Sequence, residues 1–536
     1  LIATTLSFKF KNTEIMKIKI LLITPIVLLF FISCSTKEEE SQEPNIIYVL
    51  ADDMGYGDVS VYNENSKIQT PNIDKLASEG LKFTDAHTSA SVCSPTRYGI
   101  LTGRYNWRSK LKSGVLTGKS KALISADRTT VASLLKQKNY NTAFIGKWHL
   151  GWDWAQKNPE VSGGEGWNPK DFDNIDFSKP VQNGPKELGF IYSYGHSGSL
   201  DMAPYVYVEN GMPTKIPDTT SINKGKYSWW REGPTSSDFI HDEVTPNFFR
   251  KSFEYIKEIS KEENPFFLYL ALPSPHTPIL PTEEWQGKSG LNPYGDFVMM
   301  VDSYMGQLEK VIKEAGIENN TIVIFTSDNG CSPAAYMDEL EEKGHYPSYI
   351  YRGHKADIFE GGHRVPFIVK WPQEIKKEIV SDQTICTTDL MATLANIVGY
   401  SLSDNEGEDS YNIVPLFKQM KLDIPIREAT VHHSINGSFA IRKGDWKLIM
   451  CPGSGGWSFP KPDNSEAIDS LPKYQLYNIK SDPSEATNLY PKNTEKAEEL
   501  KTLLIKYITE GRSTPGVPQK NDWIDFAWKQ IEFINQ

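Results

Sequence analysis

The chain has 536 residues, of which 39% are hydrophobic and 23% charged, a composition typical of a globular protein with one large domain and a smaller one. Its net charge of −11 argues against a nucleic-acid partner, although a local basic cluster can still bind a small anion. The five cysteines, at positions 34, 93, 331, 386 and 451, form neither a metal-binding spacing nor a dense disulfide framework, so we expect neither.

The first segment carries a predicted export signal. The basic stretch that begins at Met16 precedes an apolar run and then Ser33 and Cys34, an order that resembles a bacterial lipoprotein signal with Cys34 as the lipidated residue. We expect residues 1–34 to comprise an upstream extension and this signal. The acidic residues 35–43 resemble the tether of surface-exported lipoproteins in the Bacteroidetes group.

A transmembrane anchor is the alternative for the same segment, but its apolar run is shorter than the ~20 residues that a membrane span needs. We therefore expect membrane contact only through a lipid anchor. The predicted location is the outer-membrane cell surface, with the periplasm as the second choice.

From Pro44 onward, short apolar runs that end in polar residues alternate with helical patterns. The runs fit strands that are buried on both faces of a parallel sheet; they lie at 45–50, 142–145, 266–270 and 322–325. The helical patterns between them lie at 129–137, 246–260 and 296–315. This alternation predicts an α/β protein with a large, mainly parallel sheet flanked by helices.

Two regions depart from the alternation. Residues 152–235 are rich in Trp, Tyr, Gly, Asn and Pro and have little periodicity, which predicts long ordered loops over a site, where substrate choice usually resides. After about residue 425, short alternating segments predict a smaller domain with an antiparallel sheet and a packed helix; they lie at 438–442, 446–450 and 474–477, before a helical pattern at 494–509. We expect a catalytic domain over 44–425 and a C-terminal α+β subdomain over 426–536.

Polar residues follow the predicted strands. Asp52 and Asp53 follow the first strand, and Asp328 and Asn329 follow the fourth. The ligand crevice of a parallel sheet lies at the carboxyl ends of its strands, and oxygen donors suit Ca²⁺ or Mg²⁺. One such pair alone is more typical of a turn or a helix cap. Two pairs after separate strands favour a metal site.

Cationic residues near the same edge indicate that an anion binds there; they are Arg97, Lys147, His149, His276 and Lys355. Any single lysine is more often a solvated surface residue. Lys147 lies among apolar and aromatic neighbours in Ile-Gly-Lys-Trp-His-Leu-Gly, which is not the composition of a solvent-facing loop, and the glycine-rich surroundings of Lys355 are similarly constrained.

A specific motif covers residues 93–104, where Cys93-Ser-Pro-Thr-Arg97 begins a predicted short helix and Leu-Thr-Gly-Arg104 follows. This arrangement resembles the Cys-x-Pro-Ser/Thr-Arg motif of the type I sulfatase family in the alkaline phosphatase superfamily, and the resemblance spans roughly residues 44–510. The family resemblance implies that Cys93 is converted to formylglycine, whose hydrate is the nucleophile. A formylglycine-generating or anaerobic sulfatase-maturing enzyme would be the partner that makes it.

The resemblance also implies a role for each site residue. One Ca²⁺ per chain would be held by an oxygen of modified Cys93 and by Asp52, Asp53, Asp328 and Asn329. Arg97 would position the hydrate, and His149 would assist its deprotonation. Lys147 and Lys355 would bind the sulfate. His276, with Lys355, would donate a proton to the leaving group.

Segments 199–207 and 229–234 resemble the branch that contains N-acetylgalactosamine-6-sulfatases and arylsulfatase A-like enzymes. We therefore expect a sulfated saccharide as substrate, such as marine polysaccharide or glycosaminoglycan fragments with a 6-O-sulfate. The aromatic residues of these segments can instead simply pack the loops. The candidate sugar contacts are His196, Asp201, Arg231 and His354.

Two other functions compete with a sulfuric ester hydrolase of the arylsulfatase type. A phosphatase or phosphodiesterase of the same superfamily would use Ser or Thr as nucleophile and a second, histidine-rich zinc site, and the sequence shows no histidine cluster. A non-catalytic surface lipoprotein would bind sulfated glycans through an intact Cys93. The complete set of candidate ligands and acid/base groups favours the enzyme.

Overall fold

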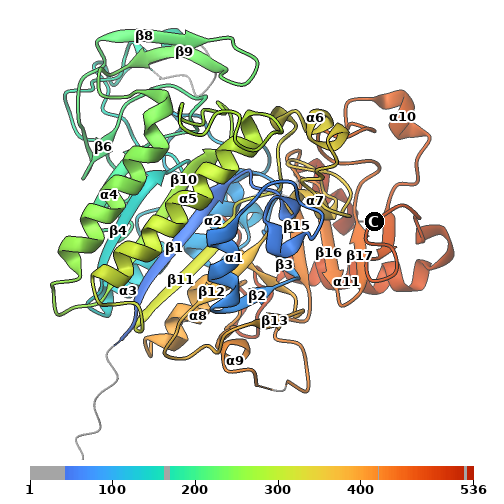
Figure 1. Cartoon of the computed structure of the whole chain (residues 1–536). Helices are drawn as coiled ribbons and strands as arrows, with labels where there is room; N and C mark the ends of the chain where they lie inside the picture. The colour runs from blue at the N-terminus through green and yellow to red at the C-terminus, as the bar shows by residue number, and fades with distance from the viewer. Residues whose placement is uncertain (1–42, 162–168, 421, 524–527, 536) are drawn as a thin grey trace, which may run out of the picture. The chain divides into compact units, whose positions relative to one another are not determined.

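The computed structural model describes residues 43–161, 169–420, 422–523 and 528–535, so the predicted signal and its Cys34 lie outside the described residues. At its centre, the four strands predicted from apolar runs lie side by side and parallel, which confirms them (Figure 1). In order across the sheet they are β11 (Thr321–Ser327), β1 (Asn45–Asp52), β10 (Phe266–Pro275) and β4 (Asn141–Lys147).

Further strands complete a ten-stranded sheet, mixed but mainly parallel, as expected. Beside β11 lie β12 (Phe367–Lys370), β2 (Leu81–Phe83) and β13 (Ile379–Ser381), of which β12 runs antiparallel to its neighbours. Beside β4 lies the parallel β5 (Tyr192–His196), followed by the antiparallel β6 (Val208–Glu209) and β7 (Met212–Pro213).

The prediction of loops throughout 152–235 was therefore wrong in part. This insertion supplies β5 to β7 and also a separate hairpin of β8 (Thr219–Asn223) and β9 (Trp230–Thr235). β5 escaped prediction because its sequence, Tyr-Ser-Tyr-Gly-His, contains no apolar run, although four of its five residues are buried. Its buried residues are Ser193, Tyr194, Gly195 and His196.

Helices cover both faces of the sheet. In Figure 1, α4 (Val244–Ile259) and α5 (Pro293–Glu314) lie in front of β10 and β1, and α1 (Pro71–Ser78) packs beside α5. On the other face, α2 (Cys93–Thr102), α3 (Val131–Gln137) and α8 (Leu390–Ile397) pack against one another. Within the described ranges, no helix has both the length and the apolar character needed to cross a membrane.

The three predicted helices are confirmed as α3, α4 and α5, with ends shifted by a few residues. α5 begins earlier than predicted because Asn292 caps it, accepting hydrogen bonds from the N–H groups of Tyr294 and Gly295, and because Pro293 suits the first helical position.

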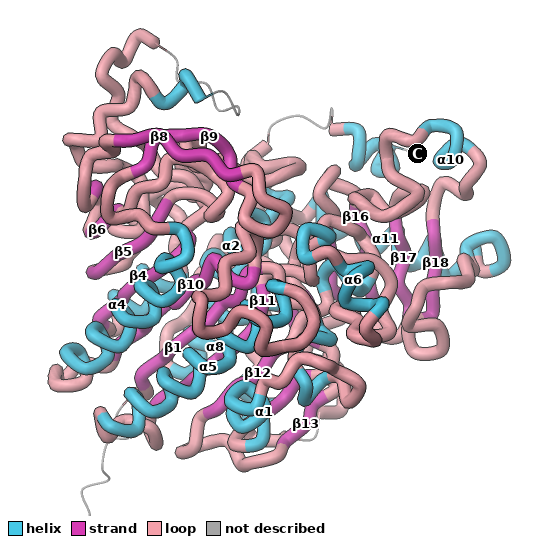
Figure 2. Tube along the Cα trace, turned by 45° about the horizontal axis from the view of Figure 1, so that its top comes forward, coloured by secondary structure: helices cyan, strands magenta, loops and turns pink. Residues whose placement is uncertain are grey.

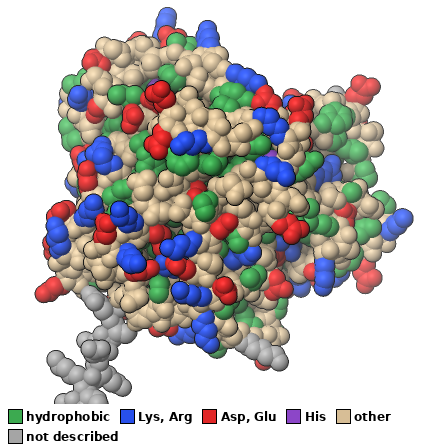
Figure 3. Space-filling view, viewed as in Figure 1, with side chains coloured by type: hydrophobic (Ala, Val, Ile, Leu, Met, Phe, Trp, Pro, Cys, Tyr) green, Lys and Arg blue, Asp and Glu red, His purple; other side chains and the backbone are tan. Residues whose placement is uncertain are grey.

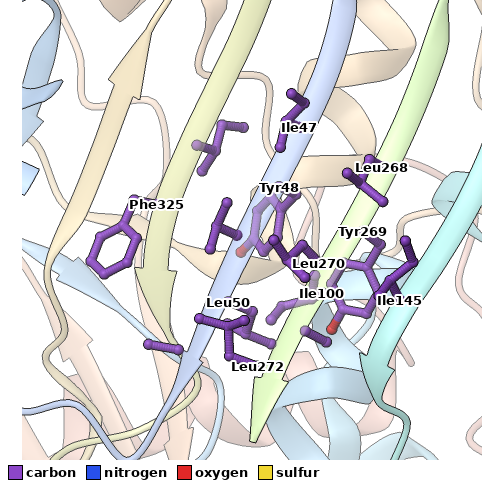
Figure 4. Packing of buried hydrophobic residues seen from close by; sticks show 14 of the residues in the cluster. Ile47, Tyr48, Leu50, Ile100, Ile145, Leu268, Tyr269, Leu270, Leu272 and Phe325 are labelled. Carbon is purple, nitrogen blue, oxygen red and sulfur yellow. The ribbon is translucent and has the colours of Figure 1, made fainter. Parts of the chain in front are cut away.

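The core between the layers is formed by the central strands. Figure 4 shows Tyr48 of β1 and Tyr269 of β10 side by side, with Ile100 of α2 near them. The two tyrosine rings have centroids 5.9 Å apart. All ten residues of β10 are buried, which explains why its sequence is a continuous apolar run.

A separate four-stranded antiparallel sheet follows in the chain, as expected, and stands beside the main sheet (Figure 2). Its strands are β15 (Thr430–His433), β16 (Phe439–Lys443), β17 (Trp446–Ile449) and β18 (Gln475–Asn478). Helix α11 (Thr494–Thr509) packs on β16 and β17 through an apolar stripe that includes Leu500 and Leu504. The remaining short strands and α-helices of the described residues are β3 (Ala86–His87), β14 (Ile385–Cys386), α6 (Met337–Glu342), α7 (Glu360–His363), α9 (Val414–Phe417) and α10 (Ser465–Asp469).

Candidate active site

The ends of the four central strands bring the predicted site residues to one edge of the main sheet. Asp52 ends β1, Asp328 follows β11, Lys147 ends β4 and His276 follows β10. Because these strands are parallel, their carboxyl ends lie together, which is where the sequence placed the crevice. Charged side chains of both signs are scattered over the face seen in Figure 3, whereas those of the site are buried.

The oxygen donors at this edge contact one another. The backbone N–H of Asp53 donates to Asp328 Oδ1 (3.2 Å), and Asn329 Nδ2 donates to Asp53 Oδ1 (2.7 Å). Asp53 Oδ2 and Asn329 Oδ1 are buried and accept no hydrogen bond within the described part of the chain. Buried oxygens of this kind need a partner, and neighbouring carboxylate and amide oxygens are the ligands that Ca²⁺ prefers. The residues present therefore fit a hard cation.

Cys93 occupies the first position of α2, which confirms the predicted short helix. Its Sγ lies 3.5 Å from Asp52 Oδ1 and 3.4 Å from Lys355 Nζ, and the residue is 1% exposed. The helix N-terminus favours negative charge near Cys93. The helix ends at Gly103, whose left-handed φ of 61° suits glycine.

Arg97 lies one turn further along α2 and is fully buried. Its Nε and Nη2 donate to Asp328 Oδ2 at 3.0 and 2.8 Å, and its Nη1 donates to the carbonyl of Lys147 at 2.9 Å. These contacts join α2 to the ends of β11 and β4. Arg97 thus orients a candidate metal ligand, a contact that sequence reasoning did not predict.

Ser199 is a site residue that sequence reasoning missed. It is fully buried, and its Oγ lies 3.1 Å from Lys147 Nζ and 3.2 Å from His276 Nδ1. Lys147 Nζ also donates to Asp52. A serine in an insertion gives no signal of its own, and only the parallel pairing of β5 with β4 brings this segment to the site.

Lys355 reaches the same centre from the loop that precedes α7. Its Nζ donates to Asp53 Oδ1 at 2.6 Å and contacts Cys93 Sγ. His276 Nε2 lies 3.7 Å from Asp53 Oδ2. The structure therefore brings Lys355 and His276 to the same carboxylate, as expected of two groups that act together.

His149 follows Lys147 by two residues and is 1% exposed. Its Nε2 donates to the carbonyl of Leu116 at 2.7 Å, which leaves Nδ1 as a buried nitrogen without a partner in the described residues. Burial, Lys147 and Arg97 hold the pKa of His149 well below its usual value, so this imidazole is neutral. Its Nδ1 can accept a proton or a hydrogen bond.

Opposite charges shape the ionisation of the site. Burial alone would raise the pKa of Asp52, but Lys147, His276 and Arg97 hold it well below its usual range. Burial would lower the pKa of Lys355, but Asp53 and its neighbours hold it above its usual value. Burial raises the pKa of the Cys93 thiol more than the two lysines lower it, so the unmodified thiol is a poor nucleophile at neutral pH.

Backbone strain marks three positions of the site. Asp53, His149 and Ala356, the residue after Lys355, have left-handed φ angles of 65°, 53° and 80°. Such conformations are costly for residues other than glycine and concentrate at functional sites.

The candidate sugar contacts lie in different surroundings. Asp201 and Arg231 form an ion pair, and the Arg231 guanidinium lies 4.7 Å from the Trp229 ring centroid. His354 lies next to Lys355 and bonds to Ser458 Oγ at 3.0 Å. His196 is 2% exposed, and its ring stacks on Phe248. The structure thus buries His196 within an aromatic cluster. Asp201 and Arg231 are paired with each other, and His354 lies beside Lys355 of the site.

The sequence shows no histidine cluster, but the fold assembles one. His87, His363 and His432 are fully buried together, from β3, α7 and β15. They do not form a zinc site, because the rings of His363 and His432 are stacked, with centroids 3.8 Å apart and planes 7° from parallel, so their lone pairs do not converge. Two buried cations, Arg442 and Lys447, also contact the cluster.

Comparison with known proteins agrees with this geometry. The sulfatase family model matches residues 44–400. An N-acetylgalactosamine-6-O-sulfatase from Bacteroides thetaiotaomicron is 32% identical over 87% of this chain and 93% of its own, and human arylsulfatase A is 29% identical over 84% of each. A solved structure concerning the metabolism of multiple glycosaminoglycans by Bacteroides thetaiotaomicron matches with a TM-score of 0.75 and 30% identity, covering 87% of this chain and 99% of that chain.

The chain therefore belongs to the sulfatase family. It is a sulfuric ester hydrolase, the activity that the names of its relatives share.

Proposed function

We propose that the protein removes sulfate from a sulfated saccharide with a formylglycine made from Cys93 and one bound Ca²⁺. The observation that carries the proposal is the position of Cys93, whose Sγ lies between Asp52 and Lys355 at the N-terminus of α2. A buried thiol with a raised pKa suits this position poorly, whereas an aldehyde hydrate placed there supplies hydroxyl nucleophiles.

The residues that would hold Ca²⁺ are Asp52, Asp53, Asp328, Asn329 and an oxygen of modified Cys93. The cation would polarise the sulfate group and favour the ionised nucleophile. The unpartnered oxygens of Asp53 and Asn329 support this assignment.

The other side chains bind the anion and move protons. Lys147 and Lys355 would bind sulfate oxygens, where a positive charge offsets the charge that develops as the S–O bond breaks. His276, 3.7 Å from Asp53 and close to Ser199, would donate a proton to the sugar oxygen together with Lys355. Neutral His149 would accept a proton from the nucleophile through Nδ1.

We propose a 6-O-sulfated N-acetylgalactosamine unit, within glycosaminoglycan or marine polysaccharide fragments, as the substrate. The relative from Bacteroides thetaiotaomicron named for this sugar sulfate supports the proposal. The Asp201–Arg231 pair with its neighbouring Trp229 offers a carboxylate, a guanidinium and an aromatic face, which are groups that bind sugar hydroxyls and ring faces.

The test combines mass spectrometry with sulfate release. The peptide containing Cys93, taken from cells with a formylglycine-generating or anaerobic sulfatase-maturing enzyme, is expected to carry the aldehyde. Cys93→Ala is expected to abolish turnover while keeping the unfolding temperature. Cys386→Ala, at a buried cysteine in the C-terminal core, is the matched control and is expected to stay active.

Three results would contradict the proposal in different ways. An unmodified thiol with no sulfate release from any sugar would favour a glycan-binding lipoprotein. Release of phosphate but not sulfate would favour a phosphatase. Full activity of Cys93→Ala would remove Cys93 from the mechanism.

The location is part of the same proposal. We infer from the N-terminal sequence that Cys34 carries a lipid that anchors the protein at the outer-membrane surface. Lipid labelling is expected to depend on Cys34, and protease added to whole cells is expected to cleave the protein. Labelling without protease access would place it in the periplasm instead.

A further inference from the structure

The loop that contains Lys355 packs against the C-terminal sheet and its loops. The backbone N–H of Ile435 donates to the carbonyl of Ala356 (3.0 Å), and the N–H of Ile358 donates to the carbonyl of Ser454 (2.9 Å). Ile358 and Phe359 form a separate apolar cluster with residues of that sheet, namely Ala440, Ile449, Cys451, Tyr477 and Ile479. The position of Lys355 therefore depends on residues that follow it by 80 or more positions in the chain.

A group of buried charges, here called the junction network, continues this contact. Its members are Asp85, His87, Glu360, His363, Arg364, His432, Arg442, Lys447 and Glu485. It contains three acids and three permanent cations, which balance when all are ionised. The network joins β3 and α7 to β15, β16 and β17.

Lys447 of β17 lies at the centre of the network and is fully buried. Its Nζ lies 3.1 Å from Glu360 Oε1, 2.9 Å from Glu485 Oε1 and 3.0 Å from His363 Nε2. The contacts with Glu360 and His363 are hydrogen bonds, and the contact with Glu485 is an ion pair. Glu360 and His363 are the first and last residues of α7, so Lys447 holds both ends of that helix.

The network extends from Lys447 to β3 through two histidines. His363 Nε2 accepts a hydrogen bond from Lys447, and His363 Nδ1 lies 3.1 Å from His87 Nδ1. His87 Nε2 lies 3.0 Å from Asp85 Oδ1 and 2.9 Å from Arg442 Nη1. Polar contacts thus run without interruption from β17 to β3.

A carboxylate pair depends on the same lysine. Glu485 Oε2 accepts from the backbone N–H of Glu360 at 2.7 Å, and Lys447 lies between the two side chains. Without the lysine, the two buried acids would lose the cation between them, and removal of one partner from a buried ion pair is strongly destabilising. Loss of this cation would loosen the contact between α7 and the sheet.

We propose that Lys447 is a positioning residue for catalysis. By holding α7 on the C-terminal sheet it fixes Lys355, five residues before Glu360, so that Lys355 Nζ stays between Asp53 and Cys93. This inference rests on the proposed role of Lys355. Lys447 does not contact the reacting atoms and acts only through α7 and the loop before it.

The test compares Lys447→Met with Lys370→Met. Lys370 is also a buried lysine surrounded by carboxylates, those of Glu79, Glu309 and Glu318, but it ends β12 at the opposite edge of the sheet. Both variants are expected to lower the unfolding temperature. Only Lys447→Met is expected to lower kcat of the folded protein, by about 100-fold with little change in KM, because a small misplacement of a catalytic group has an effect of that size.

A readout that does not require activity is hydrogen exchange of the peptide spanning 352–363. Exchange is expected to become faster in Lys447→Met and to stay unchanged in Lys370→Met. If the unsubstituted protein releases no sulfate, the proposed function fails. The hydrogen-exchange comparison still decides whether Lys447 keeps residues 352–363 in place.

The double variant Lys447→Met/Glu485→Gln separates positioning from stability. The new amide can accept from the Glu360 N–H and donate to the Glu360 carboxylate, so the unfolding temperature is expected to recover. The kcat of the double variant is expected to recover only in part. The kcat of Glu485→Gln alone is the reference for full recovery. If Lys447→Met does not fold, the comparison of the double variant with Glu485→Gln still tests the inference.

Three outcomes would overturn the inference. The first is a kcat per folded molecule in Lys447→Met equal to that of the unsubstituted protein. The second is an equal loss of kcat in Lys370→Met. The third is exchange of 352–363 that does not respond to Lys447.

Discussion

The active site and the junction network contain nearly the same charges in different geometries. The site combines Asp52, Asp53 and Asp328 with Arg97, Lys147 and Lys355. The network likewise combines three acids with three cations, and both regions also contain histidines. Composition alone therefore does not distinguish a candidate binding site from a cluster that stabilises the fold.

The use of hydrogen-bond donors separates the two regions. In the described residues, the Nζ of Lys147 and that of Lys355 each contact two acceptors, which leaves one N–H of each for a sulfate oxygen. The Nζ of Lys447 forms hydrogen bonds with Glu360 and His363 and an ion pair with Glu485, so three groups surround it. The lysines of the site have two partners each and can bind a ligand as a third, whereas Lys447 already has three partners.

Access differs at the centre of each region, although Arg364 and Arg442 at the edge of the junction network are 10% and 8% exposed. The side chain of His276 is 11% exposed and that of Lys355 is 6% exposed, so solvent and substrate can reach them. The side chains of Lys447, Glu360 and Glu485 are 0% exposed. A binding site needs incomplete pairing and an opening, and a structural cluster needs neither.

The largest expected effect contrasts Lys147→Met with Lys447→Met. Loss of Lys147 is expected to lower kcat/KM by about 10²–10³-fold, because it removes a donor that stabilises charge in the transition state. In excess Ca²⁺ its unfolding temperature is expected to change little, since the cation and Arg97 still offset Asp52. Kinetics and calorimetry on both variants check this. A large drop in the unfolding temperature of Lys147→Met would show that Lys147, like Lys447, mainly stabilises the fold.

Calcium gives the second contrast. Ca²⁺ at 100 times its Kd is expected to stabilise the folded protein by about 2.7 kcal/mol, because it binds only the native state. Asp53→Asn is expected to weaken Ca²⁺ binding and remove most of this shift, since Asp53 supplies the unpartnered oxygen of the site.

Asp85→Asn is the matched control, because Asp85 is a buried carboxylate of the junction network. It is expected to lower the unfolding temperature without changing the shift that Ca²⁺ produces. Thermal unfolding with and without Ca²⁺ measures both variants. An equal Ca²⁺ shift in Asp53→Asn and in the unsubstituted protein would contradict the proposed ligand set.

The structure brings the predicted site residues together because their signals in the sequence are local. Each central strand is a continuous apolar run whose polar end is visible in the same segment, as where Tyr48-Val49-Leu50 leads into Asp52. Parallel pairing then brings those ends together without further information. The same reasoning missed Ser199, because β5 has no apolar run to mark the strand that brings it there.

The junction network could not be predicted in this way. Its members extend from Asp85 to Glu485, and each lies in a short element or a turn where a lone charged residue is ordinary. His87, His363 and His432 carry no spacing that marks a cluster, because the packing of β3, α7 and β15 alone unites them. Side-chain groups that assemble only through tertiary packing leave little trace in one sequence.

The smallest expected effect concerns the pH dependence of stability. Burial raises the pKa of Glu485 to about 7, with Glu360 adding to the rise and Lys447 opposing it. The unfolded value is about 4.3, so the favourable contribution of this group is present below that pH and is lost as pH rises through about 7. Glu485→Gln removes the titration, and its stability relative to the unsubstituted protein is therefore expected to increase between about pH 4.5 and pH 7.

Urea unfolding across this range measures the difference, with Glu498→Gln on the exposed face of α11 as the control. Parallel stability curves for Glu485→Gln and the unsubstituted protein would mean that Glu485 keeps its charge throughout, and that the junction network, unlike the active site, does not exchange a proton near neutral pH.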